Sequence, residues 1–256
     1  MNRRVAVTGA ASGIGAATAQ LLAGKGWRVA CLDRDIEGAR RSAGDHGLAI
    51  EVDVADEASV VAAFAKVAEA FGGLDALVTA AGVIETVPFL ETTPEQFRRL
   101  FDINVIGSFL SVREGAKAMQ AGGRVCMLAS ISSYTGGGYV ASGAYATSKG
   151  AVLTMMKACA RALGEKGIAV NAVAPGFIDT PFVASAMSDP GPPPASRGRG
   201  RQDRQARADR RSHRLAGLSR SRVRPRRDPG RRWRRADALG TAGVGAPDAE
   251  APGAKG

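Results

Sequence analysis

Residues 8 to 15 read Thr8-Gly9-Ala10-Ala11-Ser12-Gly13-Ile14-Gly15. The apolar segment Val5-Ala6-Val7 precedes this turn, and a helix over residues 13–24 is expected to follow it. Glycines at such a strand–helix junction permit a tight turn. They also let the backbone approach a pyrophosphate at the positive N-terminus of the helix. The turn therefore predicts a dinucleotide site that includes Gly9, Ser12, Gly13, Ile14 and Gly15.

An acidic residue, Asp33, closes the second expected strand, over 29–32. It follows the glycine turn at close to the roughly 20-residue spacing at which a carboxylate meets the ribose hydroxyls of adenosine. A carboxylate there accepts hydrogen bonds from a ribose diol and repels a 2′-phosphate, which favours NAD over NADP. Arg34 is adjacent and softens that preference. The alternative interpretation of Asp33 is a solvated aspartate in a turn.

Apolar strands and helices alternate over the rest of residues 1–188. Further strands are expected over 49–52, 76–78, 124–129 and 168–172, and helices over about 94–119 and 144–164. Core-facing stripes are expected on two other helices, from Leu21 and Leu22 and from Val60, Val61, Phe64 and Val67. Such apolar strands, each followed by a helix, indicate an α/β fold. We expect a doubly wound parallel sheet covered on both faces, the Rossmann fold.

Composition divides the chain near residue 189. The net charge of +11 would ordinarily suggest a polyanionic partner, but the whole positive excess falls after residue 188. An Arg-, Pro- and Gly-rich stretch replaces the strand–helix pattern there, with too few apolar residues to offset the entropy of ordering. We therefore predict a Rossmann-type nucleotide-binding and catalytic domain over 1–188 and a disordered basic tail over 189–256.

The cysteines and the apolar runs exclude several classes of protein. Cys31, Cys126 and Cys159 lie in apolar segments without paired metal spacing, which predicts reduced core thiols and no metal site. No apolar run is long enough to cross a membrane, and the N-terminus leads straight into a strand rather than into a signal peptide. The sequence therefore predicts a cytoplasmic protein.

A second motif, Tyr145-Ala146-Thr147-Ser148-Lys149, lies in an expected helix. Residues four apart share a helix face, so Lys149 lies beside the Tyr145 hydroxyl. A phenol with a pKa of about 10 is a poor base at neutral pH, but a nearby ammonium favours the phenolate. Alone, this spacing is more often a solvated helix face. Its place after a serine-ended strand, in a chain with the glycine turn, favours a catalytic pair.

Residues 1 to about 185 resemble the short-chain dehydrogenase/reductase family. The ordered motifs are the glycine turn, Asp53-Val54, Ala80-Ala81-Gly82, Asn104, Ser130, Tyr145 with Lys149, and Asn171-Ala172-Val173-Ala174-Pro175-Gly176, which continues to Thr180-Pro181. The resemblance implies an NAD(P)-dependent oxidoreductase that interconverts a secondary alcohol and a ketone by hydride transfer. It implies that Tyr145 is the general acid/base, that Lys149 binds the nicotinamide ribose and lowers the tyrosine pKa, and that Asn104 holds a water in a proton relay.

The resemblance also assigns cofactor contacts. It implies adenine contacts for Asp53 and Val54, a contact along the turn Ala80-Ala81-Gly82, and nicotinamide-side contacts for Pro175, Gly176, Ile178 and Thr180. Members of the family often have paired asparagines where this chain has Ala80 and Ala81, so only backbone contact with the cofactor is expected there.

A serine would polarise the substrate oxygen, and two serines are candidates. Ser130 ends the expected strand, whereas Ser132 matches the more usual separation from the tyrosine. We favour Ser130 because Gly136-Gly137-Gly138 resembles a loop extension found in some members of the family.

The segment after Thr180-Pro181 departs from the family, which continues there with a substrate lid, a helix and a last strand. We hypothesise that the tail is a frameshifted translation. With GC-rich codon choices, Arg222 to Arg235 reads E-F-V-H-G-A-I-L-A-V-D-G-G one base later, and His213 to Leu218 reads I-A-W-L-A. Both resemble the absent family C-terminus. The alternatives are a catalytically inactive nucleotide-binding fragment and a Rossmann protein with a basic arm for nucleic acid.

The resemblance also bears on partners. Helices near 94–119 and 144–164 resemble those that pair across the family's dimer interface, so a homodimer is expected, without a membrane or nucleic-acid partner. The small-molecule partner would be an alcohol or a ketone. Its identity is not readable, because the replaced segment would form much of its pocket.

Overall fold

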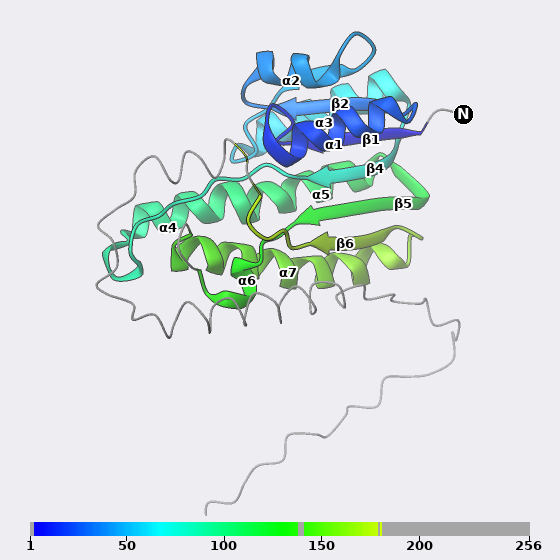
Figure 1. Ribbon diagram of the computed structural model, residues 1–256. Coiled ribbons are helices and arrows are strands. Elements are labelled where there is room, and N and C mark those ends of the chain that lie inside the picture. Colours follow the sequence, from blue (N-terminus) through cyan, green and yellow to red (C-terminus); the bar gives the residue numbers. More distant parts are fainter. Residues whose placement is uncertain (1–2, 138–140, 179, 181–256) are drawn as a thin grey trace, which may run out of the picture. The chain divides into compact units, whose positions relative to one another are not determined.

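The computed structural model describes residues 3–137, 141–178 and 180. They contain a six-stranded, wholly parallel sheet with the strand order β3-β2-β1-β4-β5-β6 (Figure 1). The strands are β1 (Arg4–Thr8), β2 (Arg28–Asp33), β3 (Leu48–Glu51), β4 (Leu74–Thr79), β5 (Met119–Leu128) and β6 (Ala169–Val173). The order reverses between β1 and β4, and ligands of such sheets bind outside the carboxyl ends of the strands at this point.

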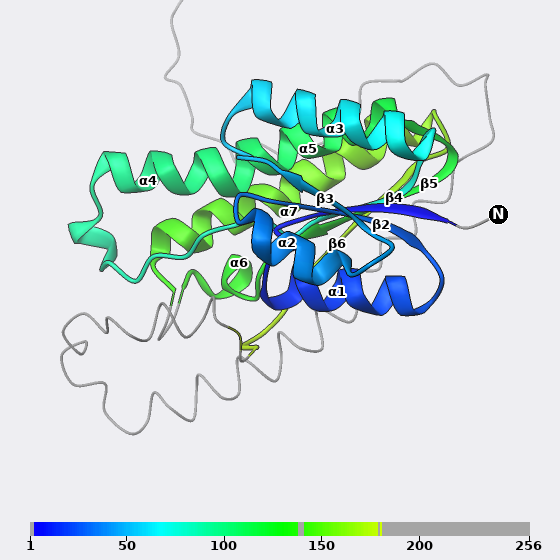
Figure 2. The same cartoon turned by 90° about the horizontal axis from the view of Figure 1, so that it is seen from above.

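Helices cover both faces of the sheet (Figure 2). Successive strand residues point to opposite faces. One set, which includes Ala6, Leu77 and Met127, packs against α3 (Glu57–Phe71), α5 (Gly107–Lys117) and α7 (Gly143–Gly164). The other set, which includes Val5 and Val7, packs against α1 (Gly13–Gly24) and α2 (Ile36–Ala43). The expected doubly wound α/β class is confirmed.

Two expected core positions are wrong. Val61 is 43% exposed, while Val60, Phe64 and Val67 are buried against the sheet. A neighbouring residue lies about 100° further round a helix, so it leaves the stripe that residues three and four apart maintain. For the same reason Leu21 is 58% exposed on α1, where Leu22 packs against the core.

The helix expected over 94–119 is divided. It consists of α4 (Pro94–Phe101), a π-helical turn η2 (Asp102–Ile106) and α5, and Met119 already begins β5. Thr93 starts α4 with a capping box that includes Gln96. Two short helices, η1 (Phe89–Glu91) and α6 (Ser132–Thr135), occupy connections on the carboxyl side of the sheet.

Several expectations concern residues outside the described ones: the boundary between 188 and 189, the missing last strand and the disordered tail. Within the described part, no helix has the length and hydropathy needed to cross a bilayer. The cytoplasmic location stays a prediction. The three cysteines are free thiols, and burial of Cys31 raises the pKa of its thiol to about 11.

Candidate active site

The glycine turn joins β1 to α1 where the strand order reverses. A side chain on Gly9, whose φ is +70°, would place its Cβ 2.4 Å from the backbone nitrogen of Ala81. A Cβ on Gly15 would lie 2.0 Å from the carbonyl oxygen of Gly9. Both distances are far inside contact, so these positions require glycine. The turn thereby packs closely on the loop after β4 and brings the N-terminus of α1 to the carboxyl edge of the sheet.

Asp33 ties the end of β2 to this turn. Its Oδ2 accepts a hydrogen bond of 2.9 Å from Ala11 N, and its Oδ1 accepts one of 3.0 Å from Asp35 N. These bonds fix the carboxylate beside the glycine turn. Asp33 and Arg34 both line the cavity that begins there.

A cavity of about 540 Å³ runs from Asp33 to Tyr145. The structure brings together on its wall all the expected cofactor residues: Gly9, Ser12, Gly13, Ile14, Gly15, Asp33, Asp53, Val54, Ala80, Ala81, Gly82, Tyr145, Lys149, Pro175, Gly176, Ile178 and Thr180. Both candidate serines, Ser130 and Ser132, also line it. Apolar lining residues that the sequence reasoning missed include Val83, Ile84, Ile131 and Ala141. No local spacing identifies them, because three separate loops carry them.

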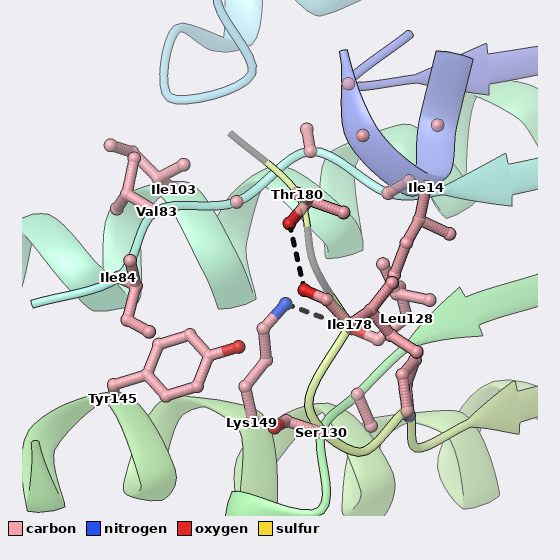
Figure 3. A pocket seen from close by; sticks show the side chains of 18 of the residues that line it. Ile14, Val83, Ile84, Ile103, Leu128, Ser130, Tyr145, Lys149, Ile178 and Thr180 are labelled. Atoms are coloured by element: carbon pink, nitrogen blue, oxygen red, sulfur yellow. Dashed lines mark hydrogen bonds between the residues drawn. The ribbon is translucent and has the colours of Figure 1, made fainter. Parts of the chain in front are cut away.

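The Tyr145 phenol and the Lys149 ammonium point into one region of this cavity (Figure 3). Both side chains are buried on the first turns of α7, which begins at the N-cap Ser142. Burial raises the pKa of Tyr145, while a side-chain hydrogen bond with Ser130 acts in the lowering direction. The expected lowering by Lys149 is not among these causes, and its Nζ lies 6.0 Å from the centroid of the tyrosine ring.

Lys149 is held by a backbone group. Its Nζ donates a 3.0 Å hydrogen bond to the carbonyl oxygen of Leu128, at the end of β5. Burial lowers the pKa of this lysine to about 8, so the ammonium is still the main form at neutral pH.

Ser130 follows the end of β5, and its side chain is hydrogen-bonded to Tyr145. The backbone N–H of Ser132 donates to Ser130 Oγ at 3.1 Å. The two serines therefore lie together on the wall, with Ser130 engaged directly by the phenol.

Asn104 lies behind the wall, buried in the π-helical turn η2. Its Oδ1 accepts a 2.8 Å bond from Val83 N, and its Nδ2 donates to Val83 O and Ser148 Oγ, both at 3.0 Å. A Cβ on Gly82 would lie 2.9 Å from Asn104 Oδ1 and 3.3 Å from Lys149 Nζ. The amide oxygen and the ammonium thus flank the same glycine. The sequence reasoning gave no role to Ser148, although it lies within the quoted motif.

Comparisons with known proteins agree with this architecture. A family model described as enoyl-(acyl carrier protein) reductase matches residues 9–204. The chain is 40% identical over 194 residues to cis-4-hydroxycyclohexanecarboxylate dehydrogenase of Sinomonas cyclohexanicum, covering 73% of this chain and 78% of that protein. It is 38% identical over 177 residues to sorbitol dehydrogenase of Cereibacter sphaeroides, covering 68% of this chain and 69% of that protein.

A solved structure extends the comparison to the fold. The 3-ketoacyl-(acyl-carrier-protein) reductase of Brucella melitensis, complexed with NADH, matches with a TM-score of 0.66 at 32% identity. The match covers 73% of this chain and 80% of that chain.

The fold and the site define a Rossmann oxidoreductase that uses a nicotinamide dinucleotide. Its wall fits that group, because the glycine turn at the N-terminus of α1 and the carboxylate of Asp33 line one continuous cavity. The chain belongs to the short-chain dehydrogenase/reductase family. It is an NAD(P)-dependent alcohol dehydrogenase/reductase, an oxidoreductase acting on CH–OH groups.

Proposed function

We propose that this chain interconverts a secondary alcohol and a ketone with NAD(H), with Tyr145 as the general acid/base. The observation that carries the proposal is the convergence of the Tyr145 phenol and the Ser130 hydroxyl in the cavity that the glycine turn also lines. A proton-transfer group and a second hydroxyl therefore face one substrate oxygen.

The chain's own residues supply binding and proton transfer. A nicotinamide dinucleotide bound along this wall would supply the hydride-transfer chemistry of the reaction. Tyr145 Oη takes the proton of the alcohol oxygen in oxidation and returns a proton to the carbonyl oxygen in reduction. Ser130 Oγ donates a hydrogen bond to that oxygen. In this proposal the buried, cationic Lys149 offsets part of the burial that raises the pKa of Tyr145, and Asn104 continues the path of the proton toward solvent.

Asp33 supports NAD as the preferred cofactor. Its carboxylate is held at the cavity wall by Ala11 N and Asp35 N, which leaves lone pairs for a ribose diol. A 2′-phosphate would meet this negative charge in a partly desolvated position. Arg34 moderates the preference from the adjacent position.

The wall next to Tyr145 supports an uncharged alcohol. Val83 and Ile84 pack beside the tyrosine ring together with Ala141. Carbon substituents on the carbinol are therefore buried against apolar groups, which favours alkyl or alicyclic neighbours over carboxylates.

A homodimer is proposed as the assembly. Ile106, at the end of η2, and Phe109, on the first turn of α5, are exposed apolar side chains in the segment for which dimer pairing is expected. Exposed apolar residues of this kind support burial against a second copy.

The experiment is NADH formation by the purified full chain with a panel of secondary alcohols, beside the Tyr145→Phe variant. We expect turnover that the variant loses by at least about 100-fold, with retained dinucleotide binding. Equal turnover by both proteins would refute the role of Tyr145. Dinucleotide binding without turnover by the folded wild type would instead favour the inactive nucleotide-binding fragment.

A further inference from the structure

Ser148 lies between Tyr145 and Lys149 on α7 and is completely buried. Its Oγ donates a 2.8 Å hydrogen bond to the carbonyl oxygen of Tyr145. The same oxygen accepts the 3.0 Å bond from Asn104 Nδ2. The hydroxyl therefore joins the helix that carries the catalytic pair to the π-helical turn that carries Asn104.

The direction of these bonds is fixed by the number of donors. A serine hydroxyl has one proton, and here that proton goes to the Tyr145 carbonyl, so toward Asn104 the oxygen can only accept. Only the NH₂ end of the Asn104 amide can supply that bond. The opposite, Oδ1 end then faces Val83 N and Gly82, the position at which Lys149 Nζ also approaches.

Three elements meet at Asn104: the loop after β4, through Val83; the π-helical turn; and α7, through Ser148. The bonds to Val83 fix the amide to the loop. Among the hydrogen bonds of the described residues, only the one to Ser148 fixes the amide to the helix that bears Lys149. Loss of that bond leaves a buried N–H without its acceptor, and such a group shifts to find another one.

We propose that Ser148 is a positioning residue of the active site, whose hydroxyl holds the oxygen of the Asn104 amide toward Lys149. This inference rests on the proposed function of Tyr145, Lys149 and Asn104. Ser148 has no contact with the reacting atoms. It acts through Asn104, by keeping an acceptor beside the ammonium through which the proton passes.

The test uses the full chain and an isosteric pair. Ser148→Thr keeps the hydroxyl and Ser148→Val replaces it with a methyl group of the same shape, so both share any steric cost. Ser148→Ala removes the hydroxyl without added volume. The matched control is Ser111→Ala, because Ser111 is equally buried and its Oγ donates only within its own helix, to Gly107 O at 2.7 Å.

The expected result is a split between catalysis and binding. We expect Ser148→Ala and Ser148→Val to lower kcat about 10-fold, with a larger solvent deuterium isotope effect and a KM for NAD within about twofold. Ser148→Thr should recover most of kcat, and Ser111→Ala should leave it unchanged. Equal kcat for the Thr and Val variants would overturn the proposal, because the hydroxyl would then have no role.

A second readout needs neither cofactor nor turnover. Ultraviolet titration of tyrosinate, taken as the difference between each protein and its Tyr145→Phe counterpart, reports the pKa of Tyr145. We expect Ser148→Ala to raise this pKa, because displacement of the Asn104 oxygen from beside Gly82 leaves the nearby ammonium less stabilised, and a less charged lysine favours the phenolate less. An unchanged titration together with an unchanged kcat would refute the positioning role.

Failure of the proposed function gives a different pattern. Wild-type turnover by Tyr145→Phe would refute the acid/base role whatever the Ser148 variants do. An inactive Tyr145→Phe beside fully active Ser148 variants would refute only the role of Ser148.

Discussion

Ser130 and Tyr145 share a side-chain hydrogen bond, so the hydroxyl just after β5 and the phenol at the start of α7 meet in the active-site cavity. Ser132 also lines the cavity but reaches this pair through its backbone, with its N–H donating to Ser130 Oγ at 3.1 Å. The arrangement supports Ser130 over Ser132 as the serine that binds the substrate oxygen.

Replacing each serine separates these two candidates. Ser130→Ala should lower kcat by about 100-fold, because the phenol and the substrate oxygen lose a shared hydrogen-bond partner in a buried site. Ser132→Ala should lower it by less than about fivefold, since the backbone N–H remains. Steady-state rates with one alcohol and saturating NAD measure both. A larger loss for Ser132→Ala would reverse the assignment.

Asp33→Asn tests the cofactor preference with the size of the side chain preserved. The asparagine Oδ1 can keep the bond from Ala11 N, but the amide NH₂ replaces the acceptor of Asp35 N, and the negative charge is gone. We expect the ratio of kcat/KM for NADP to that for NAD to rise about 10-fold, equivalent to about 1.4 kcal/mol. Asp35→Asn is the control, because that exposed residue caps α2 through its bond from Gly38 N. If this ratio stayed constant in Asp33→Asn, Asp33 would have only a structural role in the turn and would not select the cofactor.

Gly15→Ala tests the close packing of the glycine turn. The added methyl would lie 2.0 Å from Gly9 O, and the backbone must shift. We expect the free energy of unfolding to fall by about 1–3 kcal/mol and NADH binding to weaken at least tenfold. Gly24→Ala, where a Cβ meets nothing within 4 Å, should instead stabilise α1 by up to about 1 kcal/mol. Urea unfolding measures the change in stability, and fluorescence titration measures the change in NADH binding. Tight NADH binding by Gly15→Ala would contradict the proposal that the glycine turn holds the pyrophosphate.

The buried Lys149 should make stability depend on pH. Its pKa in the folded chain, about 8, is below its ordinary value of 10.5, so between these values the unfolded chain binds more protons. The free energy of unfolding should therefore rise with pH over this window, by about 3 kcal/mol in total. At neutral pH Lys149 is protonated in both the folded and the unfolded chain, so this gain in the free energy of unfolding is absent.

Lys149→Met isolates that effect from other groups. Cys31, whose pKa is raised from 9.0 to about 11, gives an opposite slope at the upper end in both proteins. Urea unfolding should therefore show that the free energy of unfolding of the wild type, minus that of Lys149→Met, increases steadily from about pH 8 to 10.5. A difference independent of pH would mean that Lys149 keeps an ordinary pKa in the folded chain.

The reading-frame hypothesis predicts a feature of the coding DNA. Read one base later from about codon 190, that DNA should encode a segment close to E-F-V-H-G-A-I-L-A-V-D-G-G over Arg222 to Arg235. A chain with the restored frame should then be more soluble and should turn over alcohols faster. A shifted frame without such a segment, or one interrupted by stop codons, would refute the hypothesis.

Features carried by short spacings could be predicted from the sequence. The glycine turn, Asp33 and the Tyr145/Lys149 pair each lie within one local segment, and the structure brings them to one cavity. The position of Asn104 could not be derived in this way, because a π-helical turn leaves no mark in an apolar repeat. Ser148 was also missed, since its partner Asn104 is distant in the sequence. The apolar pattern places Val61 in the core beside Val60, because the two β-branched residues are adjacent, but only Val60 faces the sheet.

The π-helical turn at Asp102–Ile106 has a consequence for how the length of this segment can vary. One residue more or less changes the rotation of everything after it by about 100°. A single deletion in this turn would leave the stacked rings of Phe97 and Phe101 in place, but it would turn Leu110 and Ser111 out of the core that now buries them. Related chains should therefore tolerate insertions and deletions before Thr93 or after Lys117 far better than between them. A gap inside that interval would mark a relative whose Asn104 equivalent points elsewhere.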